Sequence, residues 1–330
     1  MSEKSGSEKY TILLRLTFLA VSLAILIRIV DVKLVMNHVR DIPLRVLGFL
    51  VLLSIIRIWL TGLRWQLLNP DVSGQLSRWH YFRLMMISNT FNLFMPGALG
   101  GDIIRIALTM KTIQNKKLEN LIAIVADRLI GFFSIIVLGS IALLFMSDIQ
   151  DKWVFYLIFG LMLGIFLLTF IIAINTRMLR LLQSFFLWLG AIGSRLITLL
   201  ETWKNALIFF RDNYLRVLGA ILICLPIHGL AFLIAYFIAI SLNIKVSFFD
   251  LCIILSLVWV IVAIPITIYG AGVRELSLIY FLSLYGVEAE KAAALSVYLY
   301  IIALCVGFIV FFLILFDKCI LKTQKITETT

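Results

Sequence analysis

Six apolar runs, each about 20 residues or longer, constrain the fold of this chain more than any other feature. They lie near residues 10–30, 43–61, 118–146, 153–174, 215–242 and 289–316. A helix needs about 20 apolar residues to cross the roughly 30 Å hydrocarbon core of a bilayer. Of the 330 residues, 62% are hydrophobic and only 14% are charged, too few polar residues to cover a soluble globule. The sequence therefore predicts an all-α polytopic membrane protein with six full spans and excludes soluble enzyme folds.

Two further apolar regions, 78–112 and 250–286, are interrupted near the middle by helix-breaking residues. The breaks are Pro96, Gly97, Gly100 and Gly101 in the first region and Pro265, Gly270 and Gly272 in the second. The arms on either side are shorter than a full span. Backbone that is not hydrogen-bonded at membrane depth is tolerated only where protein or a water-filled cavity covers it. Each region is therefore predicted to form a helical hairpin.

The distribution of charge predicts the topology. Segments 2–9, 62–80, 102–119, 176–216 and 317–330 hold 17 basic and 9 acidic residues, whereas 31–41, 148–152, 243–250 and 286–291 hold 5 basic and 7 acidic residues. Because basic loops stay in the cytoplasm, the first set and both termini are expected there. Successive loops fall on the assigned sides of the membrane only under one condition. Region 78–112 must enter and leave from the cytoplasm, and region 250–286 must enter and leave from outside. Both are then re-entrant hairpins of opposite orientation.

Oppositely oriented broken segments in the two halves of a chain indicate inverted repeats, with a binding site near the membrane midplane. Ordinary packing helices with kinks remain an alternative. The predicted domains are a cytoplasmic tail (1–9), a transmembrane domain (10–316) and a second cytoplasmic tail (317–330). Within the domain, 176–214 mixes basic and apolar residues, which is typical of interfacial amphipathic helices. This connector is predicted to lie on the cytoplasmic surface, as a structural elbow or as a lipid-sensing element.

The sequence gives little support to the binding of nucleic acid, a metal or a cofactor, or to disulfide bonds. The net charge of +11 is explained by basic cytoplasmic loops, so nucleic acid is not an expected partner. The four cysteines show no CxxC spacing and the three histidines form no ligand cluster, so no metal, disulfide or cofactor is expected. His80 and His228 are predicted to be structural. The N-terminus lacks a cleavable signal pattern, so the first apolar run is expected to remain as a membrane helix.

Nine charged residues lie outside the loop segments counted above. They are Arg15, Arg28, Arg45, Arg57, Arg83, Asp127, Arg128, Arg274 and Glu275. A charge at the bilayer centre costs about 3 kcal/mol or more unless it is paired or hydrated. The first four lie close to the ends of their segments, so they are expected to reach the headgroups and to act as interfacial anchors.

Asp127 and Arg128 stand about ten residues inside the 118–146 run. Adjacent positions on a helix point about 100° apart, so each of the two residues is expected to have its own partner. For Asp127 the candidate partners are Arg83, Arg128 and Arg274. A structural ion pair and a role in transport both remain open for this carboxylate.

Each predicted hairpin carries an acid and an arginine where its second arm begins. Asp102 and Arg105 follow Gly101 in the first hairpin, while Arg274 and Glu275 follow the second break. The acids are compatible with simple helix capping. The N-terminus of a half-helix also binds phosphate or carboxylate, and a nearby guanidinium adds a bidentate donor for an anionic headgroup.

Asn89 and Asn92 stand one helical turn apart, after Arg83 and before the first break. They fall on one face of a short helix, where they are expected either to bond the interrupted backbone or to contact a lipid headgroup.

Three motifs in this order resemble a known family. The motifs are Ser88-Asn89-Thr90-Phe91-Asn92 with Pro96-Gly97-Ala98-Leu99-Gly100-Gly101-Asp102-Ile103-Ile104-Arg105, then Asp127-Arg128-Leu129-Ile130-Gly131, then Gly270-Ala271-Gly272-Val273-Arg274-Glu275. The chain resembles the lysylphosphatidylglycerol synthase transmembrane family over about residues 10–315. The resemblance implies a bundle with paired re-entrant hairpins that flips a lipid. Bifunctional members also carry a soluble aminoacyl-transferase domain, which is not expected in a chain ending at Thr330.

We therefore expect a stand-alone, non-enzymatic lipid flippase of a prokaryotic cytoplasmic membrane. Its substrate would be a polar or anionic (glyco)phospholipid or a polyprenyl-linked lipid. The expected translocation residues are Arg83, Asn89, Asn92, Asp102, Arg105, Asp127, Arg128, Arg274 and Glu275. Two alternatives stay open: a non-catalytic partner of a lipid or glycolipid synthase, and an intramembrane lipid-modifying enzyme with Asp127 or Glu275 as acid or base. Membrane lipids are the expected partners, and a homodimer is compatible with the sequence.

Overall fold

The computed structural model describes residues 25–26, 28–40, 42–69, 76–94, 100–112, 117–147, 152–174, 201, 205, 208–263 and 270–316. Within these ranges every regular element is a helix, which confirms the predicted all-α class. Several predictions fall outside the described residues: the breaks at Pro96, Gly97 and Pro265, both terminal tails, and most of the connector 176–214.

Four helical stretches in the described ranges are long and apolar enough to cross a membrane. They are Leu44–Leu68, Ile122–Phe145, Tyr214–Ser241 and Ala289–Leu313. They belong to helices α3 (Leu44–Leu68), α7 (Lys117–Ala142, continued by the 3₁₀ turn η1, Leu143–Phe145), α11 (Tyr214–Ser241) and α14 (Ala289–Phe316). The apolar runs at 43–61, 118–146, 215–242 and 289–316 therefore form helices of spanning length.

The other two predicted spans have different outcomes. The run at 153–174 forms helix α8 (Lys152–Ile174), of which the stretch Lys152–Leu168 is a shorter apolar helix. The run at 10–30 lies mostly outside the described residues. The count of six full spans therefore stays a prediction, while a multi-pass membrane protein is supported.

Both interrupted regions form pairs of short helices that pack against each other. The first pair is α5 (Arg78–Phe94) with α6 (Gly100–Thr112), and the second is α12 (Phe248–Ala263) with α13 (Val273–Ser283). At 1.5 Å per residue these helices are about 17–25 Å long, less than the roughly 30 Å hydrocarbon core. The two helix pairs match the predicted hairpin regions, and their entry from opposite membrane faces stays a prediction.

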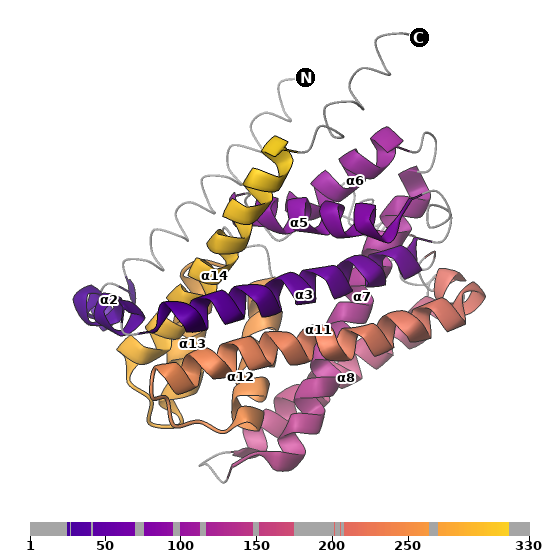
Figure 1. Cartoon of the computed structure of the whole chain (residues 1–330). Helices are drawn as coiled ribbons and strands as arrows, with labels where there is room; N and C mark the ends of the chain where they lie inside the picture. The colour runs from indigo at the N-terminus through magenta and orange to yellow at the C-terminus, as the bar shows by residue number, and fades with distance from the viewer. Residues whose placement is uncertain are drawn as a thin grey trace, which may run out of the picture.

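The two pairs are held in one bundle by helices that touch both. Helix α14 contacts α5 and α13, while α7 contacts α6 and α12. Helices α3 and α11 run alongside each other through the bundle (Figure 1). A short helix, α2 (Val32–Arg40), packs against α14 with Val35 and Val39 buried. Segments far apart in the sequence therefore meet in the interior.

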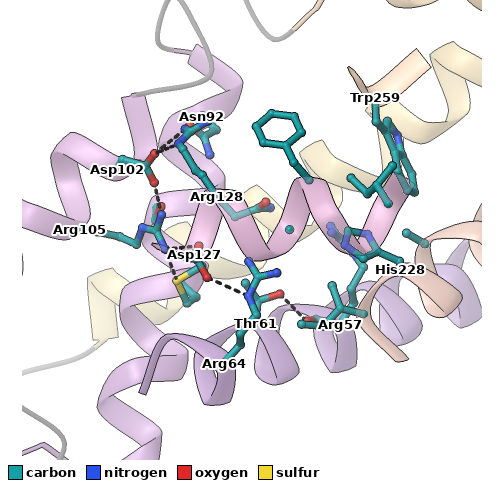
Figure 2. Close-up of a pocket in the computed structure, with 18 residues that line it drawn as sticks. Arg57, Thr61, Arg64, Asn92, Asp102, Arg105, Asp127, Arg128, His228 and Trp259 are labelled. Atoms are coloured by element: carbon teal, nitrogen blue, oxygen red, sulfur yellow. Dashed lines mark hydrogen bonds and ion pairs between the residues drawn. The ribbon is translucent and has the colours of Figure 1, made fainter. Parts of the chain in front are cut away.

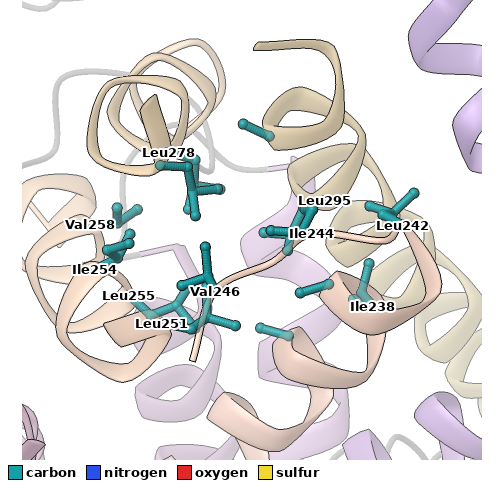
Figure 3. Packing of buried hydrophobic residues seen from close by; sticks show 14 of the residues in the cluster. Ile238, Leu242, Ile244, Val246, Leu251, Ile254, Leu255, Val258, Leu278 and Leu295 are labelled. Atoms are coloured by element: carbon teal, nitrogen blue, oxygen red, sulfur yellow. The ribbon is translucent and has the colours of Figure 1, made fainter. Parts of the chain in front are cut away.

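The largest hydrophobic core lies among α11, α12, α13 and α14. Ile238, Leu251, Ile254, Leu278 and Leu295 are buried there with at most 1% of their surface exposed (Figure 3). Apolar side chains on the outer faces of α11 and α14, such as Leu222 and Phe311, remain exposed, as expected for surfaces that contact lipid. This core fixes one part of the bundle, and the polar cavity described below lies in another.

A buried carboxylate fastens the start of α12 to its neighbours. Asp250 accepts hydrogen bonds from the Ser147 backbone N–H (3.0 Å), the Ser247 hydroxyl and the Tyr285 hydroxyl (3.1 Å). Burial, together with the nearby Asp250 carboxylate, raises the pKa of Tyr285 above its ordinary value, so this phenol keeps its proton and donates. Ser247 in turn accepts from the Asp250 N–H, which caps the helix.

Candidate functional site

A cavity of about 400 Å³ lies where α3, α5, α6, α7, α11 and α12 converge (Figure 2). Its charged lining residues are Arg57, Arg64, Asp102, Arg105, Asp127 and Arg128. Four arginines and two aspartates give these residues a net charge of +2. Charges are expensive inside an apolar bundle, so their concentration around one cavity indicates a binding site for an anion.

Asp127 of α7 bridges two arginines from other helices. Its Oδ1 lies 2.8 Å from Nε of Arg64 on α3, and its Oδ2 lies 3.2 Å from Nη1 of Arg105 on α6. All three side chains are buried, with exposed fractions of 9% or less. The Arg64 guanidinium also donates to the Cys224 sulfur (3.1 Å), and that of Arg105 lies 4.5 Å above the Trp65 ring centroid.

Asp102 of α6 forms the second bridge. One carboxylate oxygen pairs with Arg105, three residues later on the same helix, and the other accepts a hydrogen bond from Nε of Arg128 at 2.7 Å. Asp102 is buried, whereas 29% of the Arg128 side chain is exposed. The charges therefore alternate in a chain that begins at Arg64, runs through Asp127, Arg105 and Asp102, and ends at Arg128.

The structure confirms that Asp127 and Arg128 have separate partners, but the candidate partners for Asp127 were wrong. Neither Arg83, Arg128 nor Arg274 pairs with it. The physical reason is that α3 continues to Leu68, so Arg64 lies within a helix and not in the expected loop 62–80. The extra turns carry this guanidinium into the bundle next to α7.

Three predicted translocation residues do not line the cavity. The Arg83 guanidinium lies 5.5 Å from the Trp79 ring centroid, on its own helix. Arg274 and Glu275 form a separate cluster, in which Nη2 of Arg274 lies 2.9 Å from Oε1 of Glu275 and Ser296 donates to the same oxygen at 2.6 Å. The structure therefore places these three residues outside the cavity that Asp127 lines.

Glu275 also caps the start of α13. The Gly272 N–H donates to Oε2 of Glu275 at 2.6 Å, and Gly272 has a φ of +82°, in the region that favours glycine. Capping of the helix and pairing with Arg274 together use both carboxylate oxygens. The structure thus supports the capping interpretation of this acid.

Asn92 holds the first helix pair together, and Asn89 lines the cavity. Oδ1 of Asn92 accepts a hydrogen bond from the Gly101 N–H at 2.7 Å. A Cβ added at Gly101 would lie 2.5 Å from the carbonyl oxygen of Ser88, so the close approach of α5 and α6 requires glycine. Of the two interpretations for Asn92, bonding to the interrupted backbone is therefore the one observed.

Besides Arg64, several other residues of the lining were not predicted from the sequence. Arg57 was expected to be an interfacial anchor, but it lines the cavity together with His228 and Trp259. Among the described residues, Nε2 of His228 is buried and has no hydrogen-bond partner in the protein, so protein contacts do not satisfy the whole imidazole. In the sequence, only its place two residues after Pro226 inside a long apolar helix distinguishes His228.

The arrangement suits the binding of an anion better than the binding of a metal. In the described ranges, no group of three or more His, Cys, Asp or Glu side chains is close enough to hold an ion. Both cavity carboxylates are already paired with arginines. Each guanidinium group is planar and carries several N–H donors, so it is well suited to bind the oxygens of a phosphate or a carboxylate.

Comparison with known families supports this membrane setting. The family model described as the lysylphosphatidylglycerol synthase TM region matches residues 12–311. The chain belongs to this family. No curated protein and no solved structure matches it significantly. Family membership makes it a membrane protein related to lipid metabolism or transport, and all the cavity residues lie inside the matched range.

Proposed function

We propose that this protein moves a lipid with an anionic headgroup between the two leaflets of a membrane. The observation that carries the proposal is the arginine-rich cavity of about 400 Å³ inside a bundle of apolar helices. The lipid is a (glyco)phospholipid or a polyprenyl-linked lipid, whose tails stay in the hydrocarbon while the headgroup crosses. Membership of a lipid-related membrane family supports this assignment.

The main obstacle to flipping is removal of the headgroup phosphate from water. An unpaired charge at the bilayer centre costs about 3 kcal/mol or more. Guanidinium groups that line a cavity replace hydration with charge-assisted hydrogen bonds. Because the alternating ion pairs fix Arg64 and Arg105 in advance, the side chains need little reordering when an anion arrives.

Of the three arginines in the chain of ion pairs, Arg128 is the best placed to exchange partners. Its side chain is 29% exposed, whereas those of Arg64 and Arg105 are at most 9% exposed. It can therefore turn from the Asp102 carboxylate to a phosphate oxygen without uncovering the buried ion pairs. The Asp102 carboxylate stays paired with Arg105 throughout.

The two short helix pairs supply the access route in this proposal. Short helices that end inside a membrane leave polar backbone around a cavity, and paired broken helices of opposite orientation are typical of alternating access. We place the protein in a prokaryotic cytoplasmic membrane with both termini inside. We assign it no enzymatic step, because both acids of the cavity are held in ion pairs.

Reconstitution of the purified full-length protein tests the proposal. Vesicles would contain tail-labelled fluorescent phosphatidylglycerol, and dithionite added outside would bleach only label in the outer leaflet. Lipid movement is expected to expose inner-leaflet label as well. Replacement of one cavity guanidinium, Arg57→Gln, should slow this movement about tenfold, the effect of losing one charge-assisted hydrogen bond.

The matched control is Arg211→Gln, because the Arg211 side chain is 77% exposed and its ion pair with Asp212 lies outside the cavity. This variant should move lipid like the wild type. If wild-type vesicles bleach no further than empty vesicles, or if both variants behave alike, the proposal is wrong. Binding of the protein to a lipid synthase without any lipid movement would instead favour the partner function.

A further inference from the structure

The ion pairs beside the cavity hold more positive than negative charge. Asp127 lies between Arg64 and Arg105, and the structure prints both contacts within ion-pair distance (Figure 2). Asp102 lies in the same way between Arg105 and Arg128. Three guanidinium groups therefore share two carboxylates, which leaves this chain of ion pairs with a net charge of +1.

Arg57 raises the surplus of the whole lining to +2. It lines the cavity from α3, seven residues before Arg64, so the two arginines lie on one face of this helix about two turns apart. The other described lining residues are uncharged, apart from His228, which can only add a positive charge. Four arginines and two aspartates therefore leave two positive charges for a ligand to neutralise.

A surplus of this size is unfavourable inside a membrane. Asp102, Asp127, Arg64 and Arg105 are buried, with exposed side-chain fractions of 9% or less. Charges that are removed from water are normally paired in proteins, because their desolvation without a partner is costly. One negative charge would balance half of the surplus, whereas two on a single group would neutralise the whole lining. A doubly charged headgroup therefore gains more from this cavity than a singly charged one.

We infer that the headgroup bound in this cavity is a doubly charged phosphate, in the form of a phosphate monoester or a diphosphate. The inference rests on the proposed function and narrows its substrate class. Phosphatidic acid, polyprenyl phosphates and lipids joined to a sugar through a diphosphate meet the requirement. Phosphodiester headgroups, such as that of phosphatidylglycerol, carry one negative charge and are bound and moved less well.

The sharpest comparison is between phosphatidic acid and phosphatidylmethanol, whose methyl ester removes one negative charge and adds one small group. Both are used at about pH 8, where a phosphate monoester has lost its second proton. Binding is measured by thermal unfolding of the full-length protein in detergent with a short-chain form of each lipid. Movement is measured with tail-labelled forms in vesicles. Wild type should favour phosphatidic acid about tenfold in both, the effect of one further charge-assisted interaction.

Glycerol 3-phosphate distinguishes a lipid headgroup from a soluble phosphate ester. It carries the same doubly charged phosphate as phosphatidic acid but has no tails. Because the tails stay in hydrocarbon in the proposed function, short-chain phosphatidic acid should bind at least about tenfold more tightly. Equal affinity would mean that the ligand is a soluble phosphate ester, and the assignment of a lipid headgroup would be wrong.

Two variants lower the surplus from different walls of the cavity. Arg57→Gln removes a positive charge on α3, and Asn89→Asp adds a negative charge on α5 with almost no change in side-chain size. Each brings the net charge of the lining from +2 to +1, so each should bind the two lipids about equally. Arg57→Lys keeps the charge and should keep most of the preference, which separates the effect of charge from that of guanidinium shape.

The matched control is Arg211→Gln, which removes a positive charge outside the cavity from a side chain that is 77% exposed. Its preference for phosphatidic acid should equal that of the wild type. The unfolding midpoint without lipid shows whether each variant is folded. Because Arg57→Gln and Asn89→Asp change different helices, a folding defect in one still leaves the other as a test.

The outcomes separate this inference from the proposed function. Equal binding and movement of the two lipids by the wild type, or a full preference in the folded variants of lower charge, would overturn the doubly charged headgroup while lipid movement itself still supports flipping. A charge-dependent binding preference in a protein that moves neither lipid would keep the headgroup assignment and refute the flippase function.

Discussion

Asp127 neutralises two guanidinium groups that reach it from different helices. Arg64 comes from α3 and Arg105 from α6, and both are buried with the carboxylate. In a medium of low polarity each of these charges depends on the others, since removal of one partner leaves an uncompensated charge behind. The ion pairs therefore contribute to the packing of three helices as well as to the electrostatics of the cavity.

The variant Asp127→Asn tests this coupling. It keeps the shape of the side chain but leaves Arg64 and Arg105 without their common counter-charge, so the free energy of unfolding should fall by about 3 kcal/mol. Thermal unfolding in detergent would measure the loss. Asp212→Asn is the control, because the Asp212 side chain is 53% exposed in its ion pair, and its removal should leave the midpoint nearly unchanged. Equal midpoints for the two variants would contradict the buried network.

The sequence identified charged residues of this network more readily than it identified which of them form ion pairs with each other. Asp127 and Arg128 were recognisable because charges within an apolar run need partners. Arg64 was assigned to a loop because the apolar run weakens after residue 61, although the helix continues. Which arginine meets Asp127 depends on contacts between α3, α6 and α7, and no local pattern encodes those contacts.

Among the helices, the α5–α6 pair depends on a very close approach of two backbones. Gly101→Ala would add a Cβ 2.5 Å from the Ser88 carbonyl oxygen and 2.7 Å from the Asn92 amide nitrogen. The pair must separate or the Asn92 hydrogen bond must break, so we expect lower thermal stability and slower lipid movement. Both measurements use the same purified variant.

Gly160→Ala on α8 is the matched control for that change. A Cβ at Gly160 meets no atom within 4 Å, so the added methyl group points into open space. Alanine also has the higher helix propensity, and stability should be unchanged or slightly raised. Tolerance of alanine at both glycines would show that α5 and α6 do not pack as closely as described.

The helices themselves were largely predictable, whereas their breaks and ends were less so. Apolar runs of spanning length predicted α3, α7, α11 and α14, because length and hydrophobicity are read directly from the sequence. Glycines and prolines located the two helix pairs. The end of α3 was misplaced because the helix is stabilised beyond residue 61 by tertiary packing of Trp65 and Leu68, both fully buried.

For the whole molecule, the central topological prediction is that the two hairpin regions enter the membrane from opposite faces. Single cysteines near residues 75 and 115 should both react with an impermeant thiol reagent from the cytoplasmic side, in a protein without its native cysteines. A pair flanking 250–286 should react from the outside. Labelling of the 75 and 115 positions from opposite sides would make the first region a full span and remove the inverted-repeat argument.

The cavity itself is the feature on which lipid movement depends in this account. Ala231 lines it from α11 with a side chain too small to obstruct a headgroup. Gly160 on α8 lies away from the cavity and has open space around it. A bulky thiol reagent attached at each position would therefore fill the cavity in one case and only the outer surface in the other.

The most direct measurement compares lipid movement by Ala231→Cys before and after reaction with a bulky charged methanethiosulfonate. Gly160→Cys and wild type, treated identically, control for surface modification and for the native cysteines. Complete labelling at position 231 should stop dithionite access to inner-leaflet phosphatidylglycerol. Both controls should move lipid at the same rate before and after treatment with the reagent. Unchanged lipid movement by fully labelled Ala231→Cys would contradict the account, because the headgroup would then be crossing by a route other than this cavity.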